Sequence, residues 1–181
     1  NIIMTTGFYK DEFLPQWALN SDEDSLTGFM LKELREGIGD TDVFPGVIKV
    51  ALSSTEGFSK IEEKLLHSAA KAHLESGGTP VNVHCEQGKN GVQTLRLFER
   101  LGVGVNRVAL SHIDLNLSFS YYQELLEMGA LLSFDHIAHH GRPDEFYIPI
   151  LHQIRNRYGV DQLLFSLDLG RKSYWKSYGG K

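Results

Sequence analysis

The sequence is poor in cysteine, in basic residues and in long apolar runs, and each shortage excludes a class of protein. Cys85 is the only cysteine among 181 residues, so no disulfide can form within the chain, and we expect a reducing, cytoplasmic location. Lysine and arginine total 18 against 23 acidic residues, and a net charge of −5 does not indicate the excess of positive charge that is typical of proteins that bind nucleic acid. No apolar run approaches the roughly 20 residues that span a bilayer, so we expect no membrane partner either.

Strand-like and helix-like segments alternate along the chain, which is the pattern of βα units around a parallel sheet. Hydrophobic residues make up 41% of the sequence, enough for one sizeable core. Short apolar segments are the expected strands, at about 1–6, 46–52, 79–85, 107–112, 130–135 and 161–168. Segments with apolar residues at helical spacing are the expected helices, at about 22–37, 59–76, 91–101, 118–128 and 143–158.

Residues that can hold a metal stand near the ends of several expected strands. Lys49 lies near the end of PGVIKV, while TPVNVH, RVALSH and LLFSLD end in His84, His112 and Asp168. In a parallel α/β barrel the carboxyl ends of all strands meet at one face, so these residues would converge there. Each has an ordinary alternative, because a lysine can reach solvent, a histidine can be a core residue and an aspartate can cap a turn. Together they favour a metal-assisted hydrolase.

Ordered pieces of the sequence resemble the phosphotriesterase-like branch of the amidohydrolase superfamily. They are TGFY, IKVA, VH followed by E-x-G, SHID, SFD and S-x-D-x-x-R-x-S-Y-W-K-S-Y-G-G. The resemblance implies an α/β fold, the TIM (β/α)8 barrel, which typically needs ~250 residues. We therefore expect residues 1–181 to form a single, partial metal-dependent hydrolase domain. It would hold roughly strands 3 to 8, without the N-terminal βα units and the last helix.

The resemblance also implies two divalent metal ions, with zinc as the first choice and manganese, cobalt or nickel as alternatives. Lys49 would be carboxylated by CO2 and bridge both ions, because a carbamate is an anionic ligand with two oxygens. His84 and His112 would bind the second ion, and Asp168 would bind the first and take a proton from the bridging water. The His-x-His pair of the family is absent from these residues. We expect it upstream of Asn1.

Four residues are expected to bind substrate. Tyr9 stands where related lactonases place a tyrosine near the metals, with ordinary loop packing as the alternative. Arg171 and Tyr174 follow Asp168 at offsets where relatives that act on phosphorylated sugar lactones grip the phosphate. His139 takes the place of a lysine in those relatives, which would make a phosphate site weaker and sensitive to pH.

Other polar residues near the expected strand ends receive different roles. Asp135 is expected to orient its neighbours rather than bind metal, and Cys85 to pack away from the barrel mouth. His136, His139 and His140 crowd one loop, where we expect them to be solvated, with an adventitious metal site as the alternative.

These interpretations predict a hydrolase in which a bridging hydroxide attacks a lactone or another carboxylic ester, a phosphorylated sugar lactone being one option. Phosphotriester hydrolysis, as in aryldialkylphosphatases, is the alternative. A catalytically inactive barrel that binds a ligand is the alternative of another class, and the missing His-x-His pair favours it. The expected partner is a small-molecule substrate, and the resemblance leaves a homodimer open.

Overall fold

The computed structural model describes residues 2–137 and 143–180, which form one parallel sheet flanked by helices. The sheet's six strands lie side by side in sequence order. They are β1 (Met4–Gly7), β2 (Pro45–Ala51), β3 (Val81–His84), β4 (Val108–Ser111), β5 (Leu131–Phe134) and β6 (Leu163–Phe165). All neighbouring pairs are parallel, so every strand of the described sheet directs its carboxyl end to the same face.

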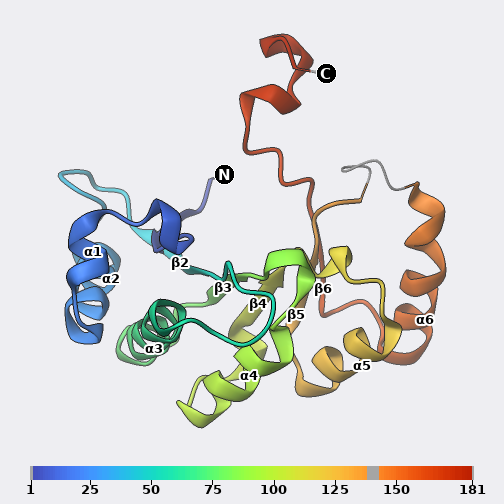
Figure 1. The fold of residues 1–181 in the computed structure, drawn as a ribbon, viewed down its shortest axis with the longest axis horizontal. Helices are drawn as coiled ribbons and strands as arrows, with labels where there is room; N and C mark the ends of the chain where they lie inside the picture. The colour runs from blue at the N-terminus through green and yellow to red at the C-terminus, as the bar shows by residue number, and fades with distance from the viewer. Residues whose placement is uncertain (1, 138–142, 181) are drawn as a thin grey trace.

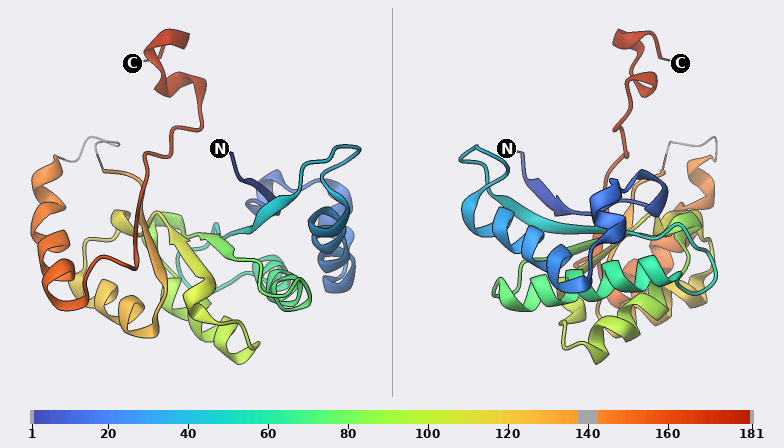
Figure 2. Two further views of the ribbon diagram at one scale, coloured as in Figure 1. Left: turned by 180° about the vertical axis from the view of Figure 1, so that it is seen from behind. Right: turned by 60° about the vertical axis from the view of Figure 1, so that its left-hand side comes forward.

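Helices follow one another along the outer side of the curved sheet (Figures 1 and 2). In the described residues they are α1 (Gln16–Asn20), α2 (Glu23–Glu36), α3 (Lys60–Glu75), α4 (Gly91–Arg100), α5 (Phe119–Met128) and α6 (Ile148–Tyr158). Strands in sequence order with helices on one side form part of a TIM barrel wall, as the sequence predicts. None of these helices is long and apolar enough to cross a membrane.

Local sequence signals explain where the longer helices begin. Asp22 caps α2 by accepting a hydrogen bond from the Ser25 amide at 2.8 Å. Ser59 and Glu62 form the predicted capping box of α3, because each side chain accepts a hydrogen bond from the other residue's backbone amide. Such caps satisfy amide groups that have no partner within the helix, and a cap of this kind is worth about 1 kcal/mol.

The core lies between the sheet and its helices. Val81 and Val83 of β3 are fully buried, and so are Leu95 and Phe98 of α4. Burying each aliphatic or aromatic side chain of this kind contributes roughly 1.5–3 kcal/mol. The strands therefore need apolar residues, and the polar residues near their carboxyl ends stand out against that background.

Some element boundaries differ from those predicted. The last helix begins at Ile148 rather than at Pro143, because Asp144–Phe146 forms a 3-10 turn and Pro149 occupies the first turn of α6. The last strand ends at Phe165 rather than at Asp168, whose φ of 44° is incompatible with an extended strand.

Apolar side chains are exposed at both edges of the sheet. Next to β1, Ile2 and Ile3 are 89% and 73% exposed, and in β6 Phe165 is 60% exposed. Within the described sheet, β1 pairs only with β2 and β6 only with β5. Both outer strands thus present backbone groups and apolar side chains to solvent.

Candidate active site

The carboxyl ends of the strands surround a cavity of about 460 Å³. Its polar and apolar lining residues are Ile3, Thr5, Tyr9, Val47, Lys49, Asn82, His84, Ser111, His112, Ser133, Asp135, Ser166 and Asp168. The structure thus brings together the five sequence-predicted site residues Tyr9, Lys49, His84, His112 and Asp168.

Lys49 extends from β2 into a partly buried position. Its Nζ donates a 2.6 Å hydrogen bond to Oδ1 of Asn82 on β3, and the Ser111 hydroxyl of β4 donates to the same oxygen at 3.0 Å. Burial lowers the pKa of Lys49 to about 8, although the charges of Asp135 and Asp168 act in the opposite direction. The neutral amine is the form that reacts with CO2, so this environment suits a lysine that becomes carboxylated.

His84 and His112 lie next to each other in the cavity wall. Nδ1 of His84 lies 2.7 Å from Nε2 of His112, and the rings meet edge to face with centroids 4.3 Å apart. His112 has a φ of 66°, a left-handed conformation that costs a non-glycine residue on the order of 1–3 kcal/mol. The end of β4 turns sharply at this residue.

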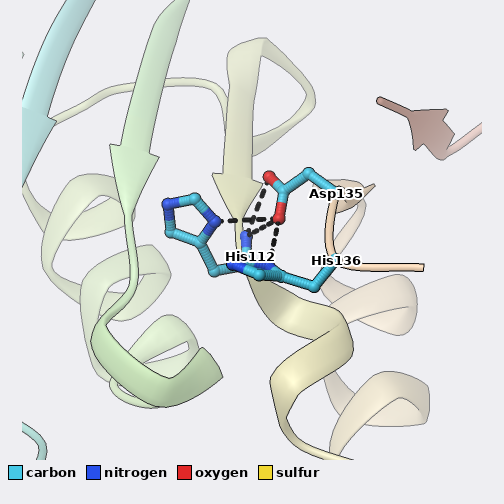
Figure 3. Close-up of side chains that lie close together, drawn as sticks. All are labelled: His112, Asp135 and His136. Carbon is cyan, nitrogen blue, oxygen red and sulfur yellow. Dashed lines mark hydrogen bonds and ion pairs between the residues drawn. The ribbon is translucent and has the colours of Figure 1, made fainter. Parts of the chain in front are cut away.

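Asp135 orients the imidazole ring of His112 through hydrogen bonds (Figure 3). Its carboxylate accepts hydrogen bonds from the His112 amide at 3.1 Å and from Nδ1 of His112 at 2.8 Å. Nδ1 of His136 lies 2.8 Å from the same Oδ1. Burial would raise the pKa of Asp135, but the hydrogen bonds from His112 and His136 outweigh it and hold that pKa well below its usual range.

His136 is buried between two carboxylates, which corrects the expectation that it is a solvated loop residue. It is 5% exposed, its amide donates to Asp114, and its Nδ1 lies 3.4 Å from Oδ1 of Asp114. Burial would lower the pKa of His136, but hydrogen bonds to Asp114 and Asp135 raise it to about 9. His139 and His140 lie outside the described residues.

The facing imidazoles fit a shared cation. A carboxylate only accepts hydrogen bonds, so Asp135 fixes the proton of neutral His112 on Nδ1 and leaves a lone pair on Nε2. Glu86 lies 3.1 Å from Nε2 of His84 and fixes that proton in the same way, leaving a lone pair on Nδ1. Burial lowers the pKa of His84 to about 4, which disfavours a second proton on His84. A divalent cation would satisfy both lone pairs.

Ligand atoms of His112, Asp135 and His136 also lie within 4.8 Å of one another in the described part of the chain. Their contacts differ from those of a metal site, because the Nδ1 atoms of His112 and His136 both lie within hydrogen-bond distance of one Asp135 oxygen. We interpret the group as hydrogen-bonded support for His112, which agrees with the orienting role expected of Asp135.

The other predicted site residues divide into two groups. Asp168 lines the cavity, and the Tyr9 ring packs edge to face on His84 with centroids 5.3 Å apart. Arg171 lies over the Tyr174 ring at 5.9 Å on the C-terminal segment, which extends away from the sheet in Figure 1. Neither residue is part of the described cavity lining.

Sequence reasoning missed three residues that hold the site together. Asp114 is completely buried beneath His136, Glu86 contacts His84, and Asn82 contacts Lys49. Asp114 belongs to the SHID motif and Glu86 to the E-x-G motif, so both were visible as motif members. Asn82 carried a different signal, a polar residue two positions before His84 in an otherwise apolar strand, which places both side chains on one face.

Comparison with known proteins identifies the family. The model of the phosphotriesterase family matches residues 1–181. The chain belongs to the phosphotriesterase family. The resemblance inferred from the sequence motifs is therefore confirmed.

Similar phosphotriesterase-family proteins support both the fold and the hydrolase class. The phosphotriesterase homology protein of Escherichia coli (strain K12) is 31% identical over 181 residues, which are 99% of this chain and 62% of that protein. Its crystal structure with phosphate in the active site has a TM-score of 0.92. The chain thus spans less than two thirds of this relative's length.

Lactonases are among the other similar proteins. The crystal structure of a lactonase from Listeria monocytogenes has a TM-score of 0.89 and is 26% identical, over 98% of this chain and 59% of that one. A phospho-furanose lactonase of Mycoplasmopsis synoviae is 26% identical over 199 residues, which are 99% of this chain and 54% of that protein.

Proposed function

We propose that the full-length protein is a metal-dependent hydrolase of lactones or other carboxylic esters. The observation that carries the proposal is the pair of imidazole nitrogens, 2.7 Å apart, in the cavity that Lys49 and Asp168 also line. Family membership supports the hydrolase class, and the two relatives named lactonases support the choice of substrate. A cavity of about 460 Å³ suits a small molecule.

The residues present would supply the ligands of one metal ion and part of those of a second. His84 and His112 would hold one divalent ion, Asp168 the other, and the carbamate of Lys49 would bridge them. When bound, the ions would supply Lewis acidity and make a water molecule acidic enough to act as a nucleophile at neutral pH. Zinc is our first choice of metal because it binds nitrogen and oxygen ligands. Manganese, cobalt and nickel bind the same ligands and are the alternatives.

The side chains of the cavity supply the remaining roles. Asp168 would accept the proton that leaves the attacking water, since it lines the cavity. Tyr9 would contact the substrate from the loop that follows β1, where its ring already packs on His84. Asp135 would keep the Nε2 lone pair of His112 directed into the cavity.

Two alternatives have support of their own. Phosphotriester hydrolysis would use the same residues, and the family name supports it. A catalytically inactive, ligand-binding barrel is favoured by the absence of a His-x-His pair from the 181 residues, because the first ion would then need ligands from outside them. Binding of phosphate by Arg171, Tyr174 and His139 remains part of the proposal for a phosphorylated sugar lactone.

The test is a metal analysis and a substrate screen of the full-length protein, loaded with zinc and bicarbonate. We expect about two ions per chain and hydrolysis of a lactone or ester in a panel that includes aryl dialkyl phosphates. Lys49→Ala and Asp168→Asn should each lower kcat/KM by at least about 10²-fold, because each removes a metal ligand or proton acceptor.

The matched control for this test is Asp161→Asn, which changes an exposed aspartate. It should leave kcat/KM unchanged. Residual activity above about a tenth in either site variant would contradict the mechanism, since loss of such a group costs orders of magnitude. A loaded protein that turns over no member of the panel would instead favour the inactive barrel.

A further inference from the structure

Glu86 holds His84 from the side opposite His112. Glu86 begins the 3-10 turn Glu86–Gly88 directly after β3, and its Oε2 lies 3.1 Å from Nε2 of His84. The other ring nitrogen, Nδ1, faces His112 at 2.7 Å. The two nitrogens of His84 therefore have different partners, a carboxylate outside the cavity and an imidazole inside it.

Lys10 anchors the Glu86 carboxylate. Its Nζ lies 2.5 Å from the same Oε2 atom, and the two side chains are 17% and 29% exposed. Lys10 comes from the loop after β1, next to Tyr9, whose ring packs on His84. The loops after β1 and β3 thus meet on this histidine.

The backbone of the Glu86 turn is also held in place. Gly88 has a φ of 67°, and a Cβ atom there would lie 2.8 Å from the carbonyl oxygen of His112. Only glycine allows the turn to approach the end of β4 this closely. The position of Glu86 is therefore fixed relative to both histidines.

We propose that Glu86 is a positioning residue that fixes the tautomer and ring orientation of His84. Its carboxylate accepts the Nε2 proton, so the Nδ1 lone pair must point at the cavity. Asp135 does the same for His112 from the other side. The inference rests on the proposed function, because it gives His84 a part in the metal centre. Carboxylate partners of this kind raise the affinity of a histidine for metal.

The first test needs no variant. Nitrogen NMR of the histidine side chains in metal-free, full-length protein distinguishes the two tautomers. We expect His84 to carry its proton on Nε2 and to have an unprotonated Nδ1. A proton on Nδ1 would overturn the proposal, whether or not any variant folds.

The second test compares variants by zinc affinity, measured in competition with a chromophoric chelator. Glu86→Ala should bind zinc about 10- to 100-fold more weakly and lose the fixed tautomer. Glu86→Gln should keep the tautomer, because Lys10 and His84 are both donors and the amide oxygen would face them. Glu56→Gln, which changes an exposed glutamate on the loop after β2, is the control and should match the wild type.

The outcomes separate this proposal from the proposed function. A Glu86→Ala protein with the affinity and tautomer of the control would show that Glu86 does not position His84. A wild-type protein that has the expected tautomer and binds zinc, but hydrolyses no substrate in the panel, would contradict the proposed function and leave the role of Glu86 intact.

Discussion

Buried carboxylates accept hydrogen bonds that hold neighbouring residues in place, both at the cavity and away from it. Glu62 is 1% exposed and accepts hydrogen bonds from three backbone amides, those of Ser53 at 2.6 Å, Ser54 at 2.8 Å and Ser59 at 2.7 Å. It therefore caps α3 and ties that helix to the loop that leaves β2, three residues beyond Val50. One side chain thus fixes the loop that follows the Lys49 strand.

The free energy of unfolding should depend on pH partly through the ionisation of Glu62. Burial would raise the pKa of Glu62, but hydrogen bonds from Ser59, Ser54 and Ser53 outweigh it and lower that pKa. A lowered folded-state pKa adds stability above the ordinary value of 4.5, and this contribution is lost as pH falls through the folded value. Glu62→Gln should therefore be less stable than the wild type at pH 7 by about 1–3 kcal/mol, with a smaller difference at acidic pH.

Urea unfolding at pH 7 and at pH values below 4.5 checks this prediction. Glu63→Gln is the control, because Glu63 is the exposed neighbour of Glu62 in the same helical turn. A stability difference that stays constant across the pH range would show that shape alone, rather than the charge of Glu62, ties the loop to the helix.

Part of the candidate site could be predicted from single residues and part could not. Lys49, His84 and His112 were visible because each is polar at the end of an apolar strand, and parallel strands share one open face. Lys10 and Glu86 meet because two loops with 75 residues between them happen to fold against one histidine. No periodicity in the sequence encodes that contact. The burial of His136 was also mispredicted, because its carboxylate partner Asp114 comes from a different loop.

At the scale of elements, β1 depends on one glycine to lie against β2. Gly7 pairs with Lys49 and has a φ of 114°, and a Cβ atom there would overlap the Lys49 carbonyl oxygen. The next amide, that of Phe8, donates to this oxygen at 2.8 Å. The backbone of Lys49 is thus held by the residues that lead into the Tyr9 loop.

Gly7→Ala should destabilise the protein by at least about 2 kcal/mol, because the new methyl group must push β1 away from β2. Gly39→Ala is the control, since Gly39 also has a positive φ, of 59°, but open space around it. Gly39→Ala should lower the free energy of unfolding by only about 1–2 kcal/mol, because alanine is strained in the left-handed conformation. Equal losses in chemical unfolding would show that backbone conformation, and not the contact with Lys49, explains the need for glycine.

The elements themselves were more predictable than their ends. Alternating apolar strands and amphipathic helices gave the order of βα units, because each pattern follows from the side that an element buries. The start of α6 was wrong because Pro143 and Pro149 both suit the first turn of a helix, and only packing selects between them.

At the scale of the whole molecule, the described sheet has two open edges. β1 and β6 each present one unpaired side, and Ile2 and Phe165 there are largely exposed. Exposed edge strands with apolar side chains pair readily with other chains. The relatives matched by this chain are longer than the part it covers.

The polypeptide of these 181 residues is expected to self-associate through the two edges. Ile2→Lys combined with Phe165→Lys should lower the associated fraction in sedimentation velocity, because charge opposes edge pairing. The control is a pair of lysines at Leu74 of α3 and Val43 before β2, which are 48% and 44% exposed. An equal decrease in both double variants would show that net charge, and not the edges, governs association.

The left-handed backbone of Asp168 sets folding against chemistry at this position. With a φ of 44°, Asp168 occupies a region where glycine would be relaxed, and its side chain is exposed. Random variation selected only for thermal resistance should therefore enrich Asp168→Gly, which releases strain of about 1–3 kcal/mol. His112 also has a positive φ, but its ring bonds to the buried Asp135, so His112→Gly should not be enriched. Selection for turnover should remove Asp168→Gly. Opposite enrichment of this variant in the two selections would identify a position that natural selection maintains for a reason other than folding.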